Sequence, residues 1–516
     1  MAVATLVSRV TGLVSKLLLA YVIGLGLVND SYTVANTLPN IVYELLLGGV
    51  LTSIVVPVLV RAQREDADGG EAYTQRLLTV ATLVLGVATV IAVLAAPLLT
   101  RLYLDGSTGK ANLALATAFG YLLLPEILFY GVGALFAAIL NTRNVFGPPA
   151  WAPVLNNLVV IATLGLYAML PGEISLNPAR MGDAKLLVLG IGTTLGIVVQ
   201  AVVLVPALWR SGFVFRWRLG WDARLSAFGG LALWVVAYVL VSQVGYVATT
   251  RVASSADAGS VAAYSYAWLL LQVPYGVLGV SLLTVIMPRM SRAAADGDTA
   301  SVVGDLSLGE RLSAVMLVPI SAVLTVLGGA AGIALFSLGR SDVEHAARLG
   351  DTIAVSAFGL LPFAVVMLQL RVFYAMHDAR TPTLINVIMV AVKVPLLLAC
   401  PLVLAPERVV LGLAFVNAVS FVVGAIVGEA WIRARLGRLQ TALVLATVAR
   451  TAAAGVAAAL AALAVVLAVP DTVPVVPRSW LELVLGTVLG GAVAVAAMIV
   501  LRVPELRAAA TRVWRR

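Results

Sequence analysis

Charged side chains that interrupt long apolar segments are the residues of this sequence with the clearest chemical meaning. A charge near the middle of a membrane costs roughly 2.5–3.5 kcal/mol even on insertion scales, so it usually faces a cavity or a partner. A cavity that is richer in cations than in acids suits an anionic solute, and a phosphate or diphosphate is the obvious kind. The basic residues inside apolar segments are Arg9, Lys16, Arg251, Arg371, Lys393 and Arg450.

These cations differ in how deeply they sit in their segments. Arg9 and Lys16 are seven residues apart, so they share one helix face, and Lys16 is the deeper of the two. Arg9 is close enough to the chain start to reach the headgroups instead. Arg251 follows a polar and aromatic stripe that either lines a cavity or joins helices. Lys393 lies near the middle of its segment and favours a cavity role. Arg371 fits a cavity role and contact with the cytoplasmic headgroups equally well, and Arg450 suits anchoring.

Three acids are the expected counterparts of these cations. Asp30 lies at the end of the first apolar segment, Glu44 shares a face with Asn40, and Glu126 directly follows Pro125. The proline should kink its helix and free a carbonyl group. Two interpretations remain open for the acids. They pair with the buried cations, or they bind protons or cations that couple transport to an ion gradient.

The composition requires lipid as the solvent. Of 516 residues, 61% are hydrophobic and 11% charged, and the mean hydropathy is +1.04. Soluble domains have about 25% charged residues. Two histidines and one cysteine, Cys400, exclude a Cys/His metal cage and a disulfide framework. We find no phosphate-binding loop, dinucleotide motif or nucleophile elbow, so we expect no cofactor and no enzyme.

The apolar segments predict an all-α polytopic membrane protein, since a span needs about 20 mostly apolar residues. Two of the predicted spans, 31–60 and 345–376, are long enough to tilt or bend. The fourteen predicted spans are 3–28, 31–60, 77–103, 112–141, 149–170, 185–208, 225–254, 259–288, 309–337, 345–376, 383–403, 408–432, 441–468 and 481–502.

The net charge of +9 follows from arginines in short loops and does not indicate nucleic-acid binding. An even number of spans places both termini on one side. The loops on that side carry the larger share of arginine and lysine, so both termini are predicted to be cytoplasmic.

The chain also repeats itself weakly. Pro57 is followed by Arg61 after four residues, and Pro288 is followed by Arg292 at the same spacing. This predicts two parallel six-helix lobes with a site between them. The predicted division is 1–222 for the first lobe, 223–436 for the second, and 437–516 for two further helices and a tail.

Several short segments, in a fixed order along nearly the whole chain, carry a resemblance to a known family. It resembles the lipid II flippase family (MurJ, also called MviN) of the multidrug/oligosaccharidyl-lipid/polysaccharide exporter superfamily, in an actinobacterial style. The matching segments begin at Ser8-Arg9-Val10, Leu38-Pro39-Asn40, Val56-Pro57, Leu140-Asn141, Ala152-Pro153, Pro274 and Phe373-Tyr374-Ala375, the last continuing to Asp378, Arg380, Thr381 and Pro382.

The resemblance implies a flippase of the bacterial cytoplasmic membrane. Such proteins move undecaprenyl-diphosphate-linked peptidoglycan precursor, lipid II, from the inner to the outer leaflet by alternating access. Two extra C-terminal helices help to form a groove for the lipid tail. Membrane potential or a monovalent cation gradient is the expected energy source, and regulators of cell-wall synthesis are expected partners.

The sequence departs from the family in its cavity cations. Arginines are common in the family where this chain has Ser15-Lys16, Tyr43-Glu44 and Trp268-Leu269. Arg9 matches directly. The substrate-binding residues implied are therefore Arg9, Lys16, Asn40, Tyr43, Arg251 and Lys393.

Alternative functions remain at this stage. A flippase for another lipid-linked oligosaccharide would look nearly the same. A drug/cation antiporter of the same superfamily would favour acidic cavity residues and twelve spans. A membrane-embedded transferase would need a catalytic His or carboxylate site, which the scattered His345 and His377 do not form.

Overall fold

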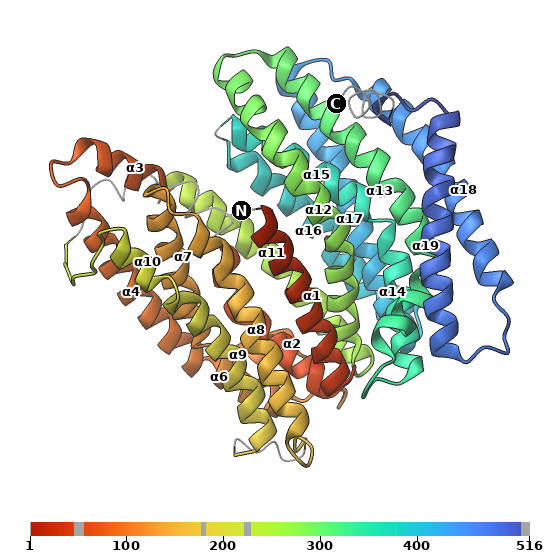
Figure 1. Ribbon diagram of the computed structural model, residues 1–516, viewed down its shortest axis with the longest axis horizontal. Helices are drawn as coiled ribbons and strands as arrows, with labels where there is room; N and C mark the ends of the chain where they lie inside the picture. The colour runs from red at the N-terminus through yellow and green to blue at the C-terminus, as the bar shows by residue number, and fades with distance from the viewer. Residues whose placement is uncertain (1, 46–55, 177–181, 221–228, 377, 507–516) are drawn as a thin grey trace. The chain divides into compact units, whose positions relative to one another are not determined.

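The computed structural model describes residues 2–45, 56–176, 182–220, 229–376 and 378–506, and these residues form helices joined by turns and short loops (Figure 1). The chain divides into two compact units, Met1–Val261 and Ala262–Arg516. We call these unit 1 and unit 2 and describe each by itself.

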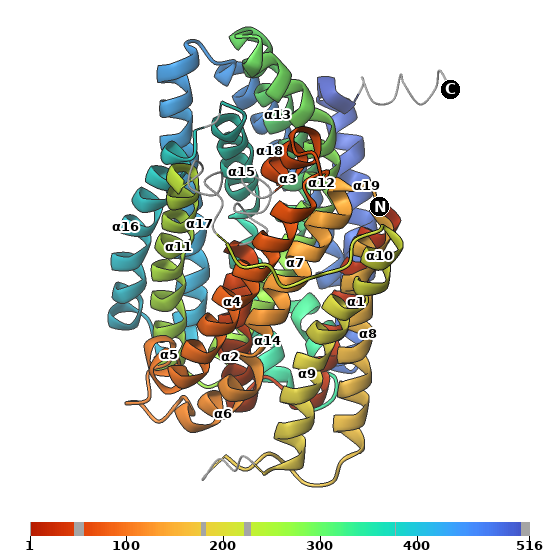
Figure 2. The same ribbon diagram turned by 90° about the vertical axis from the view of Figure 1, so that its left-hand side faces the viewer.

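Unit 1 is a bundle in which helices far apart in sequence lie side by side. Helix α1 packs along α8, α8 along α9, and α7 contacts both α2 and α9 (Figure 2). The helices of unit 1 are α1 (Ala2–Ile23), α2 (Leu27–Leu45), α3 (Val56–Glu65), α4 (Glu71–Leu94), α5 (Ala96–Tyr103), α6 (Leu113–Leu123), α7 (Glu126–Thr142), α8 (Gly147–Met169), α9 (Ala184–Val202), α10 (Val205–Arg210) and α11 (Gly229–Ala256).

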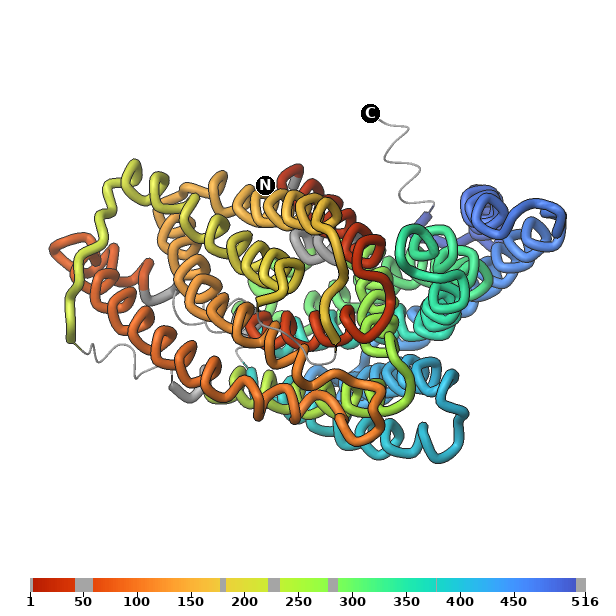
Figure 3. The backbone as a smooth tube through the Cα atoms, turned by 90° about the horizontal axis from the view of Figure 1, so that it is seen from below, coloured from red at the N-terminus to blue at the C-terminus, as the bar shows by residue number. Residues whose placement is uncertain are grey.

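Unit 2 is organised around its longest helix, α13. Helices α14, α15, α18 and α19 all pack against α13, and α18 and α19 form an antiparallel pair, blue in Figure 3. The helices of unit 2 are α12 (Ser260–Ala295), α13 (Thr299–Phe336), α14 (Val343–Ala357), α15 (Leu360–Ala375), α16 (Arg380–Val403), the 3₁₀ turn η3 (Pro406–Arg408), α17 (Val409–Leu436), α18 (Thr441–Ala468) and α19 (Val475–Val500).

The described helices confirm a multi-span membrane protein. Eleven are long and apolar enough to cross a bilayer, and α14 with α15, bent by 52°, makes a twelfth if the pair is one span. Each coincides with a predicted span. The two others, 31–60 and 259–288, include residues or side chains outside the described part of the chain. The count of fourteen therefore stays a prediction.

Two spans are interrupted near their middle, one in each unit. In unit 1, α6 ends at Leu123 and α7 begins at Glu126, so the break falls at the expected proline, Pro125. Proline has no backbone N–H and cannot continue the helical bonding. In unit 2, α14 gives way to α15 at Phe358 and Gly359. Each break ends one run of backbone hydrogen bonds and starts another, which exposes polar groups inside an apolar span.

Glycines allow α13 and α14 to cross at backbone contact. A Cβ at Gly332 would lie 2.3 Å from the carbonyl oxygen of Ala346, and one at Gly328 would lie 2.6 Å from that of Gly350. Gly328 and Gly332 are four residues apart, which is the spacing of small-residue crossings in membranes. The α13–α14 crossing thus fixes the position of α13 within unit 2.

The predicted lobe boundary at 222/223 differs in kind from the division into compact units. Helix α11 contacts α2 and α5 and so counts with unit 1, although the repeat assigns it to the second lobe. The predicted lobes are defined by repeated sequence motifs, whereas the compact units are defined by packing. The division into units therefore does not test the predicted lobe boundaries, which stay a prediction. The proposed extra helices, α18 and α19, pack on α13 through Ala458, Ala462 and Ala494.

Candidate functional site

The structure brings together two of the predicted charges, Lys16 and Glu126, inside unit 1. Lys16 lies on α1, and Glu126 is the first residue of α7 with its side chain fully buried. The two charges interact electrostatically without reaching ion-pair contact. Removing a carboxylate from water is costly unless it gains a partner, so this placement needs a physical reason.

Thr194 of α9 supplies part of that reason. Its hydroxyl lies 2.7 Å from the carbonyl oxygen of Leu122, beside the proline break, and 3.1 Å from Oε1 of Glu126. A hydroxyl has one proton to donate. If Thr194 gives that proton to Leu122, a carboxyl proton on Glu126 completes the second bond. Oε2 of Glu126 is buried without a hydrogen-bond partner. The arrangement suits a carboxyl group that gains and loses a proton.

Asn40 joins the same region through the next turn of α7. The hydroxyl of Tyr130 donates to Oδ1 of Asn40 at 2.9 Å, and the amide of Asn40 donates to the carbonyl of Asn36. Tyr130 lies one helical turn after Glu126, so both point to the same side of α7. We call Lys16, Asn40, Glu126, Tyr130 and Thr194 the unit 1 polar cluster.

Arg9 lies two turns from Lys16 and is exposed. The neighbouring positions on α1 pack against α8, because the amide of Asn157 donates to the carbonyl of Ser8 at 2.9 Å and to the hydroxyl of Thr11 at 3.0 Å. The family segment that begins at Ser8-Arg9 therefore also holds α1 against α8. Tyr43 and Glu44 lie at the end of α2, and their side chains are outside the described residues.

Asp30 and Arg251 take part in contacts near the ends of helices in unit 1. Oδ2 of Asp30 accepts the backbone N–H of Gly259 at 2.7 Å. Arg251, near the end of α11, donates to the carbonyl of Arg101 at 2.9 Å and interacts with the Asp105 carboxylate. The structure does not bring Asp30 or Arg251 into the unit 1 polar cluster. Their predicted roles in coupling and substrate binding stay predictions.

Lys393 belongs to unit 2 and bridges two neighbouring helices. Its ammonium group donates to Oδ1 of Asn417 at 2.8 Å, which links α16 to α17. Its predicted substrate contact stays a prediction. Sequence reasoning missed both Asn417 and Thr194. Each is a polar side chain within a long apolar segment, which is the signal that could have found them.

The last family segment forms a polar turn in unit 2. Asp378 accepts the backbone N–H groups of Arg380 and Thr381 at the start of α16. Its carboxylate also pairs with Arg435 of α17 at 2.6 Å. Partial burial alone would raise the pKa of Asp378, but the bonds from Thr381 and the Arg435 guanidinium outweigh it and hold that pKa below its usual range.

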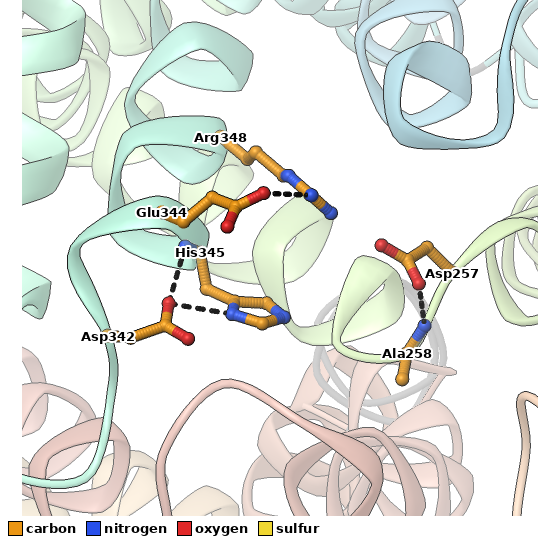
Figure 4. A network of polar contacts seen from close by, with 6 residues as sticks. All are labelled: Asp257, Ala258, Asp342, Glu344, His345 and Arg348. Atoms are coloured by element: carbon orange, nitrogen blue, oxygen red, sulfur yellow. Dashed lines mark hydrogen bonds and ion pairs between the residues drawn. The ribbon is translucent and has the colours of Figure 1, made fainter.

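A further polar network begins helix α14 in unit 2 (Figure 4). Asp342 accepts both the backbone N–H and the Nδ1 of His345 at 2.8 Å, and Arg348 pairs with Glu344 one turn on. The backbone N–H of His345 is the main reason that the pKa of Asp342 lies below its usual range. His345 is thereby part of a helix cap. Among the described residues, no three or more His, Cys, Asp or Glu side chains gather closely enough to hold a metal ion.

Comparisons with known proteins identify the family. The sequence model of the lipid II flippase MurJ matches residues 19–484. A probable lipid II flippase MurJ of Vibrio cholerae is 30% identical over 400 residues, which cover 74% of this chain and 73% of the relative. The lipid II flippase MurJ of Burkholderia cenocepacia is 28% identical over 391 residues, with 74% and 73% covered.

Solved structures show the same fold. A lipid II flippase MurJ in an inward closed conformation aligns with a TM-score of 0.75 at 18% identity, over 97% of this chain and 99% of that one. An inward-facing multidrug resistance MATE transporter aligns with a TM-score of 0.65 at 15% identity, over 83% and 95%. These structures show the fold alone, and the sequence decides the family. The chain belongs to the lipid II flippase MurJ family.

Proposed function

We propose that this chain moves lipid II, the undecaprenyl-diphosphate-linked peptidoglycan precursor, from the inner to the outer leaflet by alternating access. One observation carries the proposal: the family match extends over residues 19–484, nearly the whole membrane region. The buried charges of unit 1 support the proposal, because charged side chains inside a membrane cost free energy and usually mark the path of a charged solute.

The diphosphate of the substrate is the group that the chain's cations would hold. Arg9 and Lys16 lie on one face of α1, so both can contact one anion that passes along that helix. Asn40 and Tyr130 add neutral donors one helix away. Arg251 and Lys393 are the further cations we assign to substrate binding at other stages of the cycle.

Glu126 is the group we assign to coupling. In the empty carrier, Lys16 and Glu126 offset one another's charge. When the diphosphate binds Lys16, the Glu126 carboxylate no longer has a cation that offsets its charge. It therefore takes up a proton. The protonated carboxyl group then donates a hydrogen bond to the Thr194 hydroxyl, 3.1 Å away, and that hydroxyl donates to the carbonyl oxygen of Leu122. Release of substrate returns Lys16 to Glu126 and expels the proton, so substrate and proton occupancy are linked.

Membrane potential is a sufficient energy source for the return step. One elementary charge that crosses 100 mV gains about 2.3 kcal/mol. A net inward movement, with the empty carrier, of the cavity cations that Glu126 does not offset would use that energy. We place the protein in the bacterial cytoplasmic membrane with both termini in the cytoplasm, since arginine-rich loops favour that side. No chemical transformation is part of this cycle, and regulators of cell-wall synthesis are the further partners we propose.

The test uses variants of Lys16 in a strain depleted of its own flippase. Lys16→Ala removes a charge-assisted contact worth about 1.5–3 kcal/mol, so flipping should fall roughly 10- to 150-fold and growth should not be restored. Arg61→Ala is the matched control, because Arg61 is exposed and its ion-pair partner among the described residues is Glu65 on its own helix. Both variants should reach the membrane at wild-type levels.

A vesicle assay with headgroup-labelled lipid II separates the alternatives. Wild-type protein should move labelled lipid II and should leave cationic drugs where they are. Transport of a cationic drug in exchange for protons would instead establish the antiporter. Normal growth of the Lys16→Ala strain would exclude Lys16 from substrate binding. Glu126→Gln should still bind lipid II while its transport rate loses pH dependence.

A further inference from the structure

Unit 2 contains a small, partly open polar cavity that the proposed flippase cycle does not use. Ser307 and Glu310 of α13 line one side, Glu429 of α17 lines another, and Gln440 and Thr441 close it at the start of α18. We call this the Glu310 cavity. Apolar side chains complete its wall, so its polar atoms line one small, partly open space.

Within the part of the chain that the structure describes, neither carboxylate of the cavity has a basic partner. Glu310 is 6% exposed, and its Oε1 is buried without a hydrogen-bond donor. Glu429 accepts the Thr441 hydroxyl at 2.5 Å and interacts unfavourably with Glu310. Among the described residues, the nearest cation along α13, Arg311, is engaged with Glu505. Two carboxylates that line one cavity repel each other, and either a cation or a proton between them relieves that cost.

A neutral oxygen gives independent evidence for a ligand. Ser307 is 3% exposed, lines the cavity one turn before Glu310, and its hydroxyl has no hydrogen-bond partner. Buried hydroxyl groups in native proteins nearly always have a partner, so the Ser307 hydroxyl calls for an ion or a water molecule. Oε1 of Gln369, whose side chain reaches Glu310, is buried and unpartnered as well. The unsatisfied atoms are all oxygens, and oxygens are the ligands that hard cations prefer.

The size of the cavity restricts the cation. It has room for about one particle of the size of water. Mg²⁺ usually keeps several of its waters, and Ca²⁺ takes six to eight oxygens, so neither fits an enclosure of this size. We propose that the Glu310 cavity binds one dehydrated monovalent cation, such as Na⁺, through Ser307, Glu310 and Glu429.

The bound cation would join α13 to α17 directly and α18 through the bond from Thr441 to Glu429, at one end of unit 2. Glu310 belongs to α13, Glu429 to the last turns of α17, and Thr441 opens α18. Occupancy of the cavity would therefore hold the α18–α19 pair against α13. This role concerns the stability of unit 2 and is independent of which solute the carrier moves.

The test measures thermal stability of the purified full chain against Na⁺ concentration. N-methyl-D-glucamine replaces Na⁺ at constant ionic strength, since that cation is far too large for the cavity. A ligand that binds only the folded protein raises the melting temperature progressively above its dissociation constant. We expect such a rise for the wild type and its loss in Glu310→Gln, which keeps the shape of the side chain.

Two further variants make the result specific. Ser307→Ala removes one neutral ligand without changing the charge, so the rise should move to higher Na⁺ concentration. Glu407→Gln changes an exposed carboxylate of the same unit and should respond to Na⁺ like the wild type. The proposal would be overturned if the melting temperature of the wild type did not change with Na⁺, or if that of Glu310→Gln still rose with Na⁺. A response to pH alone would overturn it too, since it would identify a protonation site.

Discussion

Asp30 offers a sharp test of whether a buried acid couples transport or anchors the fold. Its carboxylate is 2% exposed and accepts the N–H of Gly259 at 2.7 Å, which ties the start of α2 to the turn between α11 and α12. Three substitutions separate the interpretations: Asp30→Ala, Asp30→Asn and Gly259→Ala. If Asp30 anchors the turn, an oxygen is needed at this position and a charge is not.

The structure sets the expected costs. Asp30→Ala leaves the buried N–H of Gly259 without an acceptor, which costs about 1–3 kcal/mol. Asp30→Asn keeps an acceptor oxygen and should cost less than about 1 kcal/mol. Gly259 has φ of +86°, and a Cβ there would lie 2.9 Å from the carbonyl oxygen of Leu25. Gly259→Ala should therefore cost about 1–3 kcal/mol through backbone strain.

Thermal melts and lipid II flipping should be measured on the same preparations. A loss of 1 kcal/mol lowers the melting temperature of a cooperative unit of this size by roughly 2–4 °C. We expect Asp30→Ala and Gly259→Ala to melt lower, and Asp30→Asn to melt and flip like the wild type. If Asp30→Asn melts normally but no longer flips, the anchor interpretation is refuted. The coupling role predicted from the sequence would then stand.

Two other predictions concern unit 2. Gly332→Ala should destabilise the protein by about 1–3 kcal/mol, because the new Cβ meets backbone atoms of α14 that cannot move aside. Gly491→Ala is the control and should leave the stability unchanged, since no atom lies within 4 Å of its Cβ. Equal melting temperatures of the two variants would contradict the crossing geometry. The Asp378 carboxylate should stabilise the fold above about pH 4 and lose that contribution as the pH falls through its lowered pKa. The melting temperature of Asp378→Asn should therefore fall less steeply in acid than that of the wild type. Parallel curves of melting temperature against pH would contradict the Arg435 contact.

Much of the fold could be predicted from the sequence, because hydropathy and segment length are local properties. A run of apolar residues long enough to span lipid has few alternatives to a helix. The break at Pro125 was predictable for the same reason, since the missing N–H acts within its own turn. A bend in the span 345–376 was expected from its length, but its position at Gly359 was not predicted, because glycine permits a bend without requiring one.

The site was less predictable, because helical spacing defines a face and not the neighbour that covers it. Lys16 and Glu126 were both selected from the sequence, yet their approach depends on how α1 and α7 pack. Thr194 has an ordinary residue type and matters only through its position beside Leu122. Glu310 and Glu429 were overlooked although both lie in apolar segments. Their proximity joins α13 to α17, which are far apart in the chain.

The length of α13 has a consequence for the direction from which ions arrive. Its 38 residues extend about 57 Å, whereas the hydrocarbon of a bilayer is about 30 Å thick. The charged residues of α13, Asp305, Glu310 and Arg311, all lie in its first third, and the stretch from Leu312 to Phe336 has no charge. The uncharged stretch therefore occupies the hydrocarbon, and the first turns project into the headgroups and water of one leaflet. Glu310 then lies at that boundary, so its cavity would sense the salt of a single compartment whichever way the carrier faces.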